Sequence, residues 1–335
     1  MKITVLGDGA WGTALALVAL QNKHEVRLWG AFPDYIDRMR QTRRNEQFMP
    51  GVALPDELTL EADLAAAVKD VELVIGAVPV QYMRGMLELA RAVNFPADAV
   101  YVNVGKGIEL DSLMRPSQLV FEYLGGGTQY IALSGPSHAE EVVKHVPTAV
   151  VVAGTRPASA AKVQQALMND SFRIYTSEDV TGVELGGALK NVYAVAAGIC
   201  DGMGLGDNSK AAMITRAIAE MGRLGKALGG APETFAGLSG VGDLIVTCVS
   251  RHSRNRHVGE ALGQGRKLDE IQAEMGKTVA EGVKTTKSAS ELARSKNVST
   301  PIIDEVYATL YEGKDPRQAV QDLMRREPKP ENPVA

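Results

Sequence analysis

The chain has 335 residues, which is long enough for two domains with separate cores. With 45% hydrophobic and 23% charged residues it has an ordinary globular composition, and a formal net charge of −4 gives no electrostatic reason to expect a nucleic-acid partner. Two cysteines, Cys200 and Cys248, are too few and too far apart for a disulfide framework or a zinc site, so free thiols in a reducing compartment are expected.

No part of the sequence resembles an export signal or a membrane span. The start, MKITVLG, reaches a glycine four residues past Lys2, which is too short an apolar run for a signal peptide. No apolar stretch approaches the ~18–20 residues that a membrane helix needs. The sequence therefore predicts a soluble, cytoplasmic protein.

The first half of the chain alternates strand-like and helix-like segments. Helical patterns lie between several of the strands, for example over Gln81–Val93 and Ala158–Met168. This alternation predicts βαβ units and a largely parallel sheet, although the last two strands could be an antiparallel addition. The predicted strands are Ile3–Leu6, Glu25–Trp29, Leu73–Val78, Val100–Val104, Tyr130–Leu133, Thr148–Ala153 and Phe172–Tyr175.

After about Glu178, strand-like runs nearly vanish and long helical patterns follow. Glycine-rich joints at 202–206 and 237–243 are expected to interrupt them. We therefore predict an α/β protein with an N-terminal Rossmann-like, doubly wound sheet over 1–185 and a C-terminal all-α domain over 186–325. The tail, 326–335, has three prolines and little apolar content, which predicts disorder. The predicted helices are Val183–Ile199, Ser209–Leu228, Val279–Arg294, Ile302–Tyr311 and Pro316–Arg325.

A glycine motif follows the first predicted strand directly. Gly7, Gly9 and Gly12 match G-x-G-x-x-G between a strand and a helix, which is the context in which this pattern binds a dinucleotide. Gly7 permits a tight turn, Gly9 lets a pyrophosphate approach the backbone, and Gly12 lets helix and strand pack closely. The phosphates would lie at the helix N-terminus, where free N–H groups and the helix dipole favour anions.

Loops after later strands carry the next candidates, because ligands of open α/β sheets bind at the carboxyl ends of the strands. Lys106 stands between two glycines, where it suits either an anion contact or a solvated turn. Gly135 and Ser137 precede a short helix, and their donors could bind a substrate oxygen or cap that helix.

The helical half offers several charged candidates. Lys190 lies in a helix of small and apolar residues, where burial would lower its pKa and allow proton exchange near neutrality, unless the side chain extends to solvent. Asp243 follows a glycine-rich segment, and Glu281 begins a predicted helix, where a carboxylate also favours the dipole. Arg254, between a serine and an asparagine, offers a planar fork that suits phosphate, or belongs to a solvated basic helix start.

In this order, these segments resemble the bacterial-type NAD(P)-dependent glycerol-3-phosphate dehydrogenase family, over essentially the whole chain up to about residue 325. Eight segments in the same order make the resemblance specific, whereas no single one would. They are GDGAWGTALA, HEVRLWG, KG at 106–107, SGPSHA, GGALKNVYAVAAG, GVGDLIVTC, SRNR and AEG.

The resemblance implies a role for each matching position. The family's catalytic lysine corresponds to Lys190, supported by Asn191, Asp243 and Thr247. The implied substrate contacts are Lys106, Gly135, Ser137, Lys190, Asp243, Ser253, Arg254 and Asn255. The implied cofactor contacts are Gly7, Gly9, Ala10, Trp11, Gly12, Ala31, Lys106, Ala139, Arg254, Val279 and Glu281, and no metal is implied.

The expected reaction interconverts dihydroxyacetone phosphate and sn-glycerol 3-phosphate, which feeds phospholipid synthesis. Lys190 would protonate the carbonyl oxygen, Asp243 would orient Lys190, and Arg254 with Asn255 would hold the phosphate. The expected partners are this small molecule and, in a homodimer, a second copy of the chain. Two alternatives remain open: a related β-hydroxyacid or ketopantoate-type reductase, and a sensor that binds NAD(P)H without turnover.

The chain departs from the family pattern mainly at the adenosine end of the cofactor site. Ala10 stands where the family often has serine, and His138 where it often has an aromatic residue. After HEVRLWG the chain has Ala31 and no acid until Asp34, so nothing at the usual position repels a 2′-phosphate. Both NAD and NADP are therefore expected to work, with a preference below roughly a hundredfold. Three cations on the next segment could move toward the ribose: Arg38, Arg43 and Arg44.

Overall fold

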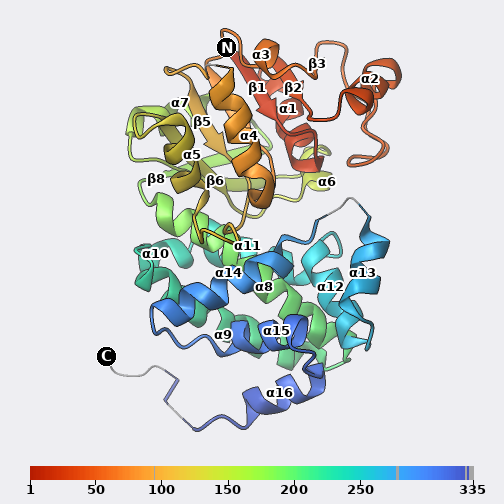
Figure 1. Ribbon diagram of the computed structural model, residues 1–335, viewed down its shortest axis with the longest axis vertical. Coiled ribbons are helices and arrows are strands. Elements are labelled where there is room, and N and C mark those ends of the chain that lie inside the picture. Colours follow the sequence, from red (N-terminus) through yellow and green to blue (C-terminus); the bar gives the residue numbers. More distant parts are fainter. Residues whose placement is uncertain (94, 277–278, 329, 332–335) are drawn as a thin grey trace.

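A single sheet organises the first half of the chain (Figure 1). The computed structural model describes residues 1–93, 95–276, 279–328 and 330–331. Within them the sheet has eight strands in the order β3-β2-β1-β4-β5-β6-β7-β8. The strands are β1 (Lys2–Leu6), β2 (Glu25–Trp29), β3 (Thr59–Glu61), β4 (Leu73–Gly76), β5 (Val100–Asn103), β6 (Gln129–Ser134), β7 (Thr148–Ala153) and β8 (Phe172–Ser177).

The predicted strands are confirmed to within two residues at each end, and only the short β3 was not predicted. The structure also shows whether the last two strands are an antiparallel addition to the sheet. β7 pairs antiparallel with β6, whereas β8 pairs parallel with β7 and every other pair is parallel. β4 and β5 are buried along their whole length, as expected for parallel strands covered on both faces.

The direction of winding reverses at β1, which lies between β2 and β4. The register aligns the ends of neighbouring strands, since Leu6 pairs with both Trp29 and Gly76, and Asn103 pairs with Gly76 and Ala132. The loops after β1, β2, β4, β5 and β6 therefore share one edge of the sheet. This is the edge where doubly wound sheets bind their ligands.

Helices cover both faces of the sheet (Figure 1). α1 is buried on all sides over Gly12–Ala19 because α6 and α7 pack against it from outside the sheet. α2 and α5 were not predicted, although each begins with a proline at its first position, a usual start signal. These helices are α1 (Ala10–Gln21), α2 (Pro33–Thr42), α3 (Leu64–Ala67), α4 (Val80–Ala92), α5 (Pro116–Leu124), α6 (Ala139–Val142) and α7 (Pro157–Leu167).

The second half of the described chain is helical and packs around α8, whose residues from Gly182 to Cys200 are all buried. α12 approaches α8 so closely that a Cβ at Gly198 would lie 2.0 Å from the backbone oxygen of Arg256. The predicted long helices are confirmed to within three residues at each end. The helices are α8 (Val180–Gly202), α9 (Gly206–Ala227), α10 (Pro232–Phe235), α11 (Asp243–Val249), α12 (Arg254–Gly263), α13 (Leu268–Met275), α14 (Glu281–Ser295), α15 (Pro301–Tyr311) and α16 (Pro316–Met324).

The two glycine-rich joints behave differently. The segment 202–206 does separate α8 from α9, as predicted. The prediction for 237–243 is confirmed only at its start, where α10 has ended and Gly237 is extended; Leu238–Gly242 then forms a π-helical turn, η1, that runs directly into α11. Its glycines permit packing rather than a break, since a Cβ at Gly240 would lie 2.1 Å from the backbone oxygen of Phe235.

The segment after α16 was predicted to be disordered over 326–335. Residues 329 and 332–335 of it lie outside the described residues, and the remaining five have neither helix nor strand. Among the described residues, no helix combines the length and the apolar character needed to cross a bilayer.

Candidate functional site

The ligand-binding edge of the sheet faces the helical half, where α8 and α11 meet the loop after β5 (Figure 1). Three charged side chains from these segments contact one another: Lys106 from the loop, Lys190 from α8 and Asp243 at the first position of α11. They are far apart in sequence: the packing of α8 on α11 joins Lys190 and Asp243, and the packing of the two halves brings Lys106 to them.

Lys190 is almost fully buried, and its ammonium group has two protein partners. It donates to Oδ1 of Asp243, and it donates to Oγ1 of Thr247 at 2.8 Å. Thr247 lies one turn after Asp243 on α11 and donates its own hydroxyl proton back to the Asp243 backbone oxygen at 2.6 Å. Because an ammonium group has three N–H donors, one remains for a ligand.

Lys106 binds the other oxygen of the same carboxylate. Its Nζ donates to Oδ2 of Asp243 at 2.5 Å. It also donates to a second acceptor, the backbone oxygen of Gly135, at 3.2 Å. Its aliphatic stem passes over Gly187 on α8, where a Cβ would lie 3.4 Å from Cγ of Lys106. The structure thus brings Lys106, Gly135, Lys190, Asp243 and Thr247 together.

The electrostatics of this group favour one excess positive charge. Burial, assisted by the Lys106 ammonium and opposed by the Asp243 carboxylate, lowers the pKa of Lys190 to about 8. Burial alone would raise the pKa of Asp243, but the two ammonium groups outweigh it and hold this pKa below its usual value. Near neutrality the three groups therefore carry a net charge of +1, which suits an anionic ligand or an oxygen that gains negative charge.

A second polar chain continues from α8 to α12 and α14. Nδ2 of Asn191 donates to Oε2 of Glu281 at 3.2 Å, and Nδ2 of Asn255 donates to Oδ1 of Asn191 at 2.9 Å. Oδ1 of Asn255 accepts from the backbone N–H of Gly282 at 2.8 Å. Burial raises the pKa of Glu281, with the charge of Arg254 as the largest effect in the opposite direction. Asn191, Asn255 and Glu281 therefore form one connected network beside Lys190.

The predicted phosphate-binding residues lie at the start of α12 and have different environments. Ser253 is buried, and its hydroxyl caps the helix by accepting from the backbone N–H of Arg256 at 3.2 Å. Asn255 is held by the network above. Arg254 is exposed, and among the described residues its guanidinium has no hydrogen-bond or ion-pair partner. Of the three side chains, Arg254 is therefore the charged one, and its guanidinium has all five N–H donors free of protein partners in the described structure.

The glycine motif has the backbone geometry that its spacing predicts. Gly7 has a positive φ of +118°, and a Cβ there would lie 2.6 Å from the backbone oxygen of Ala77 after β4. A Cβ at Gly12 would lie 2.0 Å from the backbone oxygen of Gly7, whereas a Cβ at Gly9 would meet nothing within 4 Å. Gly9 therefore leaves open space at the start of α1, and that space fits the pyrophosphate of a dinucleotide.

The remaining cofactor candidates lie along the same edge. Ala10 and Trp11 open α1, and the Trp11 ring lies 6.3 Å from that of Phe172. Ala31 follows β2 and is exposed, and Ala139 is the buried first residue of α6. Ser137 donates its hydroxyl proton to the backbone oxygen of Gly135 at 2.9 Å, beside the Lys106 contact. A small pocket between the loops after β4 and β5 and the start of α14 has Lys106, Val279 and Glu281 in its lining.

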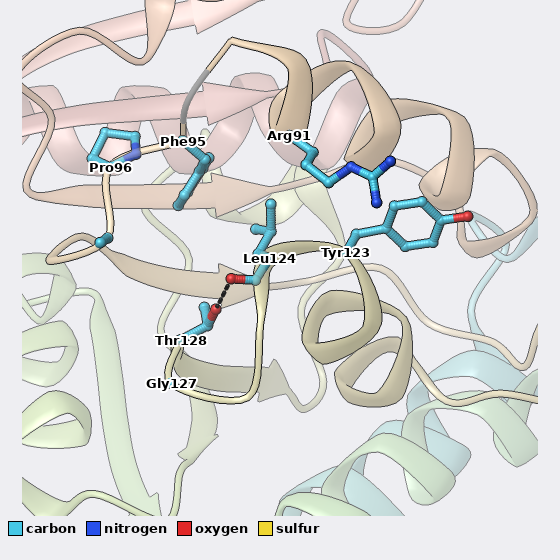
Figure 2. A pocket seen from close by; sticks show the side chains of 8 residues that line it. Arg91, Phe95, Pro96, Tyr123, Leu124, Gly127 and Thr128 are labelled. Carbon is cyan, nitrogen blue, oxygen red and sulfur yellow. Dashed lines mark hydrogen bonds between the residues drawn. The ribbon is translucent and has the colours of Figure 1, made fainter.

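A larger surface pocket lies elsewhere (Figure 2). It is lined by the end of α4, the end of α5 and the turns before β5 and β6, with Arg91 and Tyr123 on one side and Pro96 and Thr128 on the other. These turns precede their strands, so the pocket is at the amino edge of the sheet, opposite Lys190. It contains none of the candidate residues. Within the described chain, no group of acidic, histidine and cysteine side chains is arranged to hold a metal ion.

Comparison with known proteins gives one consistent family. The family models for the N-terminus and the C-terminus of NAD-dependent glycerol-3-phosphate dehydrogenase match residues 2–160 and 179–321. A protein from Geobacillus kaustophilus named glycerol-3-phosphate dehydrogenase (NAD(P)+) is 51% identical over 332 residues, covering 98% of this chain and 96% of the relative. A protein of the same name from Chlorobium phaeobacteroides is 48% identical and covers 99% of both chains.

The solved structures agree. The crystal structure of glycerol-3-phosphate dehydrogenase (gpsA) from Coxiella burnetii has a TM-score of 0.92 and 37% sequence identity, and the match covers 97% of this chain and 99% of that one. The Rossmann-like sheet, the helical half and the order of the motifs are thus shared over nearly the full length. The chain belongs to the NAD-dependent glycerol-3-phosphate dehydrogenase family.

Proposed function

We propose that this protein interconverts dihydroxyacetone phosphate and sn-glycerol 3-phosphate with NADH or NADPH, and that it supplies glycerol 3-phosphate for phospholipid synthesis. The observation that supports this most strongly is the buried Lys190–Asp243–Lys106 group, which lies at the same edge of the sheet as the glycine motif. When bound, the nicotinamide donates or accepts the hydride, and the protein supplies position and a proton.

In the direction of reduction, the free N–H of Lys190 donates a proton to the carbonyl oxygen of the substrate. Asp243 and Thr247 take the other two donors and so fix the direction of the remaining one. The lowered pKa of Lys190, about 8, allows the group to lose and regain a proton near neutrality, as a general acid must. In the direction of oxidation, the neutral amine accepts the hydroxyl proton.

Two further cations act on the substrate without donating the reacting proton. Lys106 places a second positive charge near the same oxygen and stabilises the negative charge that develops on it. Arg254 binds the phosphate with its free guanidinium fork, and Asn191 and Asn255 orient the substrate between these groups. The remaining predicted contacts, including Gly135, Ser137 and Ser253, stay predictions.

The most direct test follows the absorbance of the reduced nicotinamide with three substrates in parallel. Dihydroxyacetone phosphate should be reduced efficiently, unphosphorylated dihydroxyacetone poorly, and ketopantoate, which has a carboxylate in place of the phosphate, not measurably. Efficient reduction of ketopantoate would instead identify the related reductase. Binding of NADH without turnover of any substrate would identify a sensor.

Three further features stay proposals. The boundary between the domains stays at 185/186 as predicted, a position that lies within α8. A cytoplasmic location fits the two free, buried cysteines, Cys200 and Cys248. A homodimer is expected and can be checked by light scattering of the full chain.

A further inference from the structure

One acidic side chain lies inside the glycine motif and was not singled out by its spacing. Asp8, between Gly7 and Gly9, turns its carboxyl group toward the end of β2, where a Cβ at Gly30 would lie only 2.8 Å from Oδ2 of Asp8. The same Cβ would lie 2.7 Å from Cδ1 of Ile36 on α2. The carboxyl group therefore fills the space beside Gly30 that a side chain at that position would need.

The end of the second strand, where Asp8 points, has a general function in doubly wound sheets. An acid at the end of the second strand, about 20 residues past the glycine motif, usually binds the adenosine ribose hydroxyls of NAD. Here β2 ends at Trp29 and is followed by Gly30 and Ala31, neither of which has a polar side chain. Because β1 and β2 are neighbours and Leu6 pairs with Trp29, a side chain just after β1 can reach the same place.

The surroundings of Asp8 fix its backbone but leave its carboxylate short of a partner. The backbone oxygen of Asp8 accepts from Nδ2 of Asn45 at 2.7 Å and from the Thr13 hydroxyl at 3.4 Å. Oδ2 of Asp8 is buried and has no hydrogen-bond partner among the described residues. Burial raises the pKa of Asp8, and a hydrogen bond from its own backbone offsets this only in part. Asp8 as a whole is only partly buried, so its carboxyl group can still accept from a ligand hydroxyl that binds beside it.

We propose that Asp8 takes the place of the missing acid after β2, binds the adenosine ribose hydroxyls, and sets the preference of this enzyme for NADH over NADPH. The inference rests on the proposed function only in that a dinucleotide binds at the glycine motif. A 2′-phosphate would bring a second negative charge against the carboxylate, and like charges at close range repel. NADPH still binds, more weakly, because a half-buried carboxyl group with a raised pKa is neutralised more easily than an exposed one.

The experiment measures binding without substrate. NADH and NADPH are titrated against the full-length protein by the change in nicotinamide fluorescence, and ADP and 2′,5′-ADP are titrated by displacement of NADH. Asp8→Asn keeps the shape of the side chain and removes its charge. We expect it to move the ratio of the two dissociation constants by about tenfold or more in favour of NADPH, with the same shift for 2′,5′-ADP over ADP.

The matched control is Asp34→Asn. Asp34 is the first acid after β2 in the sequence, lies in the first turn of α2 and is exposed. If Asp8 sets the preference, this control leaves the ratio within about twofold of the wild type. A shift in Asp34→Asn without one in Asp8→Asn, or no shift in either variant, would overturn the inference.

Folding and the proposed function are checked separately. The melting temperature of each variant shows whether it is folded, and Asp8→Ser is the second variant if Asp8→Asn does not fold, with the same expected shift. If the wild type bound neither dinucleotide, the proposed function itself would fail. If the wild type bound both dinucleotides and every variant kept the wild-type ratio of the two dissociation constants, only the proposed role of Asp8 would be contradicted.

Discussion

The sheet half and the helical half contribute to the site in different ways. The sheet half supplies mainly backbone: a positive φ at Gly7, open space at Gly9 and aligned strand ends. The helical half supplies ionisable side chains, Lys190 and Asp243, held in a buried pair that Lys106 completes from the other side. Substitutions in the first half should therefore change binding or folding, whereas substitutions in the second should change the chemistry.

The largest effect is expected for Asp243→Asn, which leaves two neighbouring ammonium groups without their shared carboxylate. Removing one partner of a buried ion pair costs about 3–5 kcal/mol, so the free energy of unfolding should fall by that amount and turnover should be lost. Urea unfolding measures the first and the absorbance assay the second. Asp37→Asn, which breaks an exposed pair with Arg40, should cost less than ~1 kcal/mol. Equal losses of stability in both variants would show that the buried ion pairs of Asp243 contribute no more than an exposed pair.

Lys190→Ala changes the same buried Lys190–Asp243–Lys106 group but should affect turnover much more than stability. Asp243 keeps Lys106 as its partner, so the fold should be largely retained, while kcat should fall by at least ~10²-fold because the general acid is gone. Lys226→Ala, at an exposed position near the end of α9, is the control and should keep the wild-type kcat. A folded Lys190→Ala variant with near wild-type kcat would remove Lys190 from the mechanism.

The two halves also differ in how much of the candidate site could be predicted from the sequence. The glycine motif was predicted from six consecutive residues and their flanking segments, because its function depends on local backbone geometry. The unusual setting of Lys190 was also visible, since its helix is otherwise small and apolar. Its partner Asp243 lies 53 residues away, so that contact depends on how α8 and α11 pack. Lys106 lies 137 residues from Asp243, so that contact depends on how the two halves pack. Neither contact can be found from local sequence.

Two misses have local physical reasons. The segment 237–243 was predicted to interrupt the helices because glycine is usually a breaker, but here glycines allow η1 to pack against the backbone of Phe235. The proposed role of Asp8 could not be predicted from the sequence, because an acid at that place in the motif has no fixed role. Its significance appears only when Gly30 is seen beside it.

Arg254→Ala tests the predicted phosphate contact at the edge of the helical half. The side chain is exposed and unpaired in the described structure, so its removal should leave stability unchanged, but kcat/KM for dihydroxyacetone phosphate should fall roughly 30-fold, equivalent to about 2 kcal/mol. The loss for unphosphorylated dihydroxyacetone should be much smaller. Arg251→Ala, three residues earlier and also exposed, serves as the control. Equal losses on both substrates would mean that Arg254 acts on the cofactor or the fold.

The smallest effects are expected from a matched pair in the glycine motif. Gly9→Ala adds a Cβ to open space, so it should weaken NADH binding by about tenfold while the melting temperature stays near that of the wild type. Gly12→Ala adds a Cβ 2.0 Å from the backbone oxygen of Gly7, so it should lower stability by about 1–3 kcal/mol. Fluorescence titration and thermal unfolding measure the two effects. The reverse pattern would contradict the assignment of Gly9 to the pyrophosphate.

The measurement that tests the central claim most directly is the pH dependence of kcat/KM for the wild type in both directions. Lys190 must be protonated to act in reduction and neutral to act in oxidation, and its pKa in the folded protein is lowered to about 8. The rate of reduction should therefore fall, and the rate of oxidation rise, as the pH increases through about 8. If both profiles were flat through this range, or if they moved in the same direction, a group other than Lys190 would be transferring the proton.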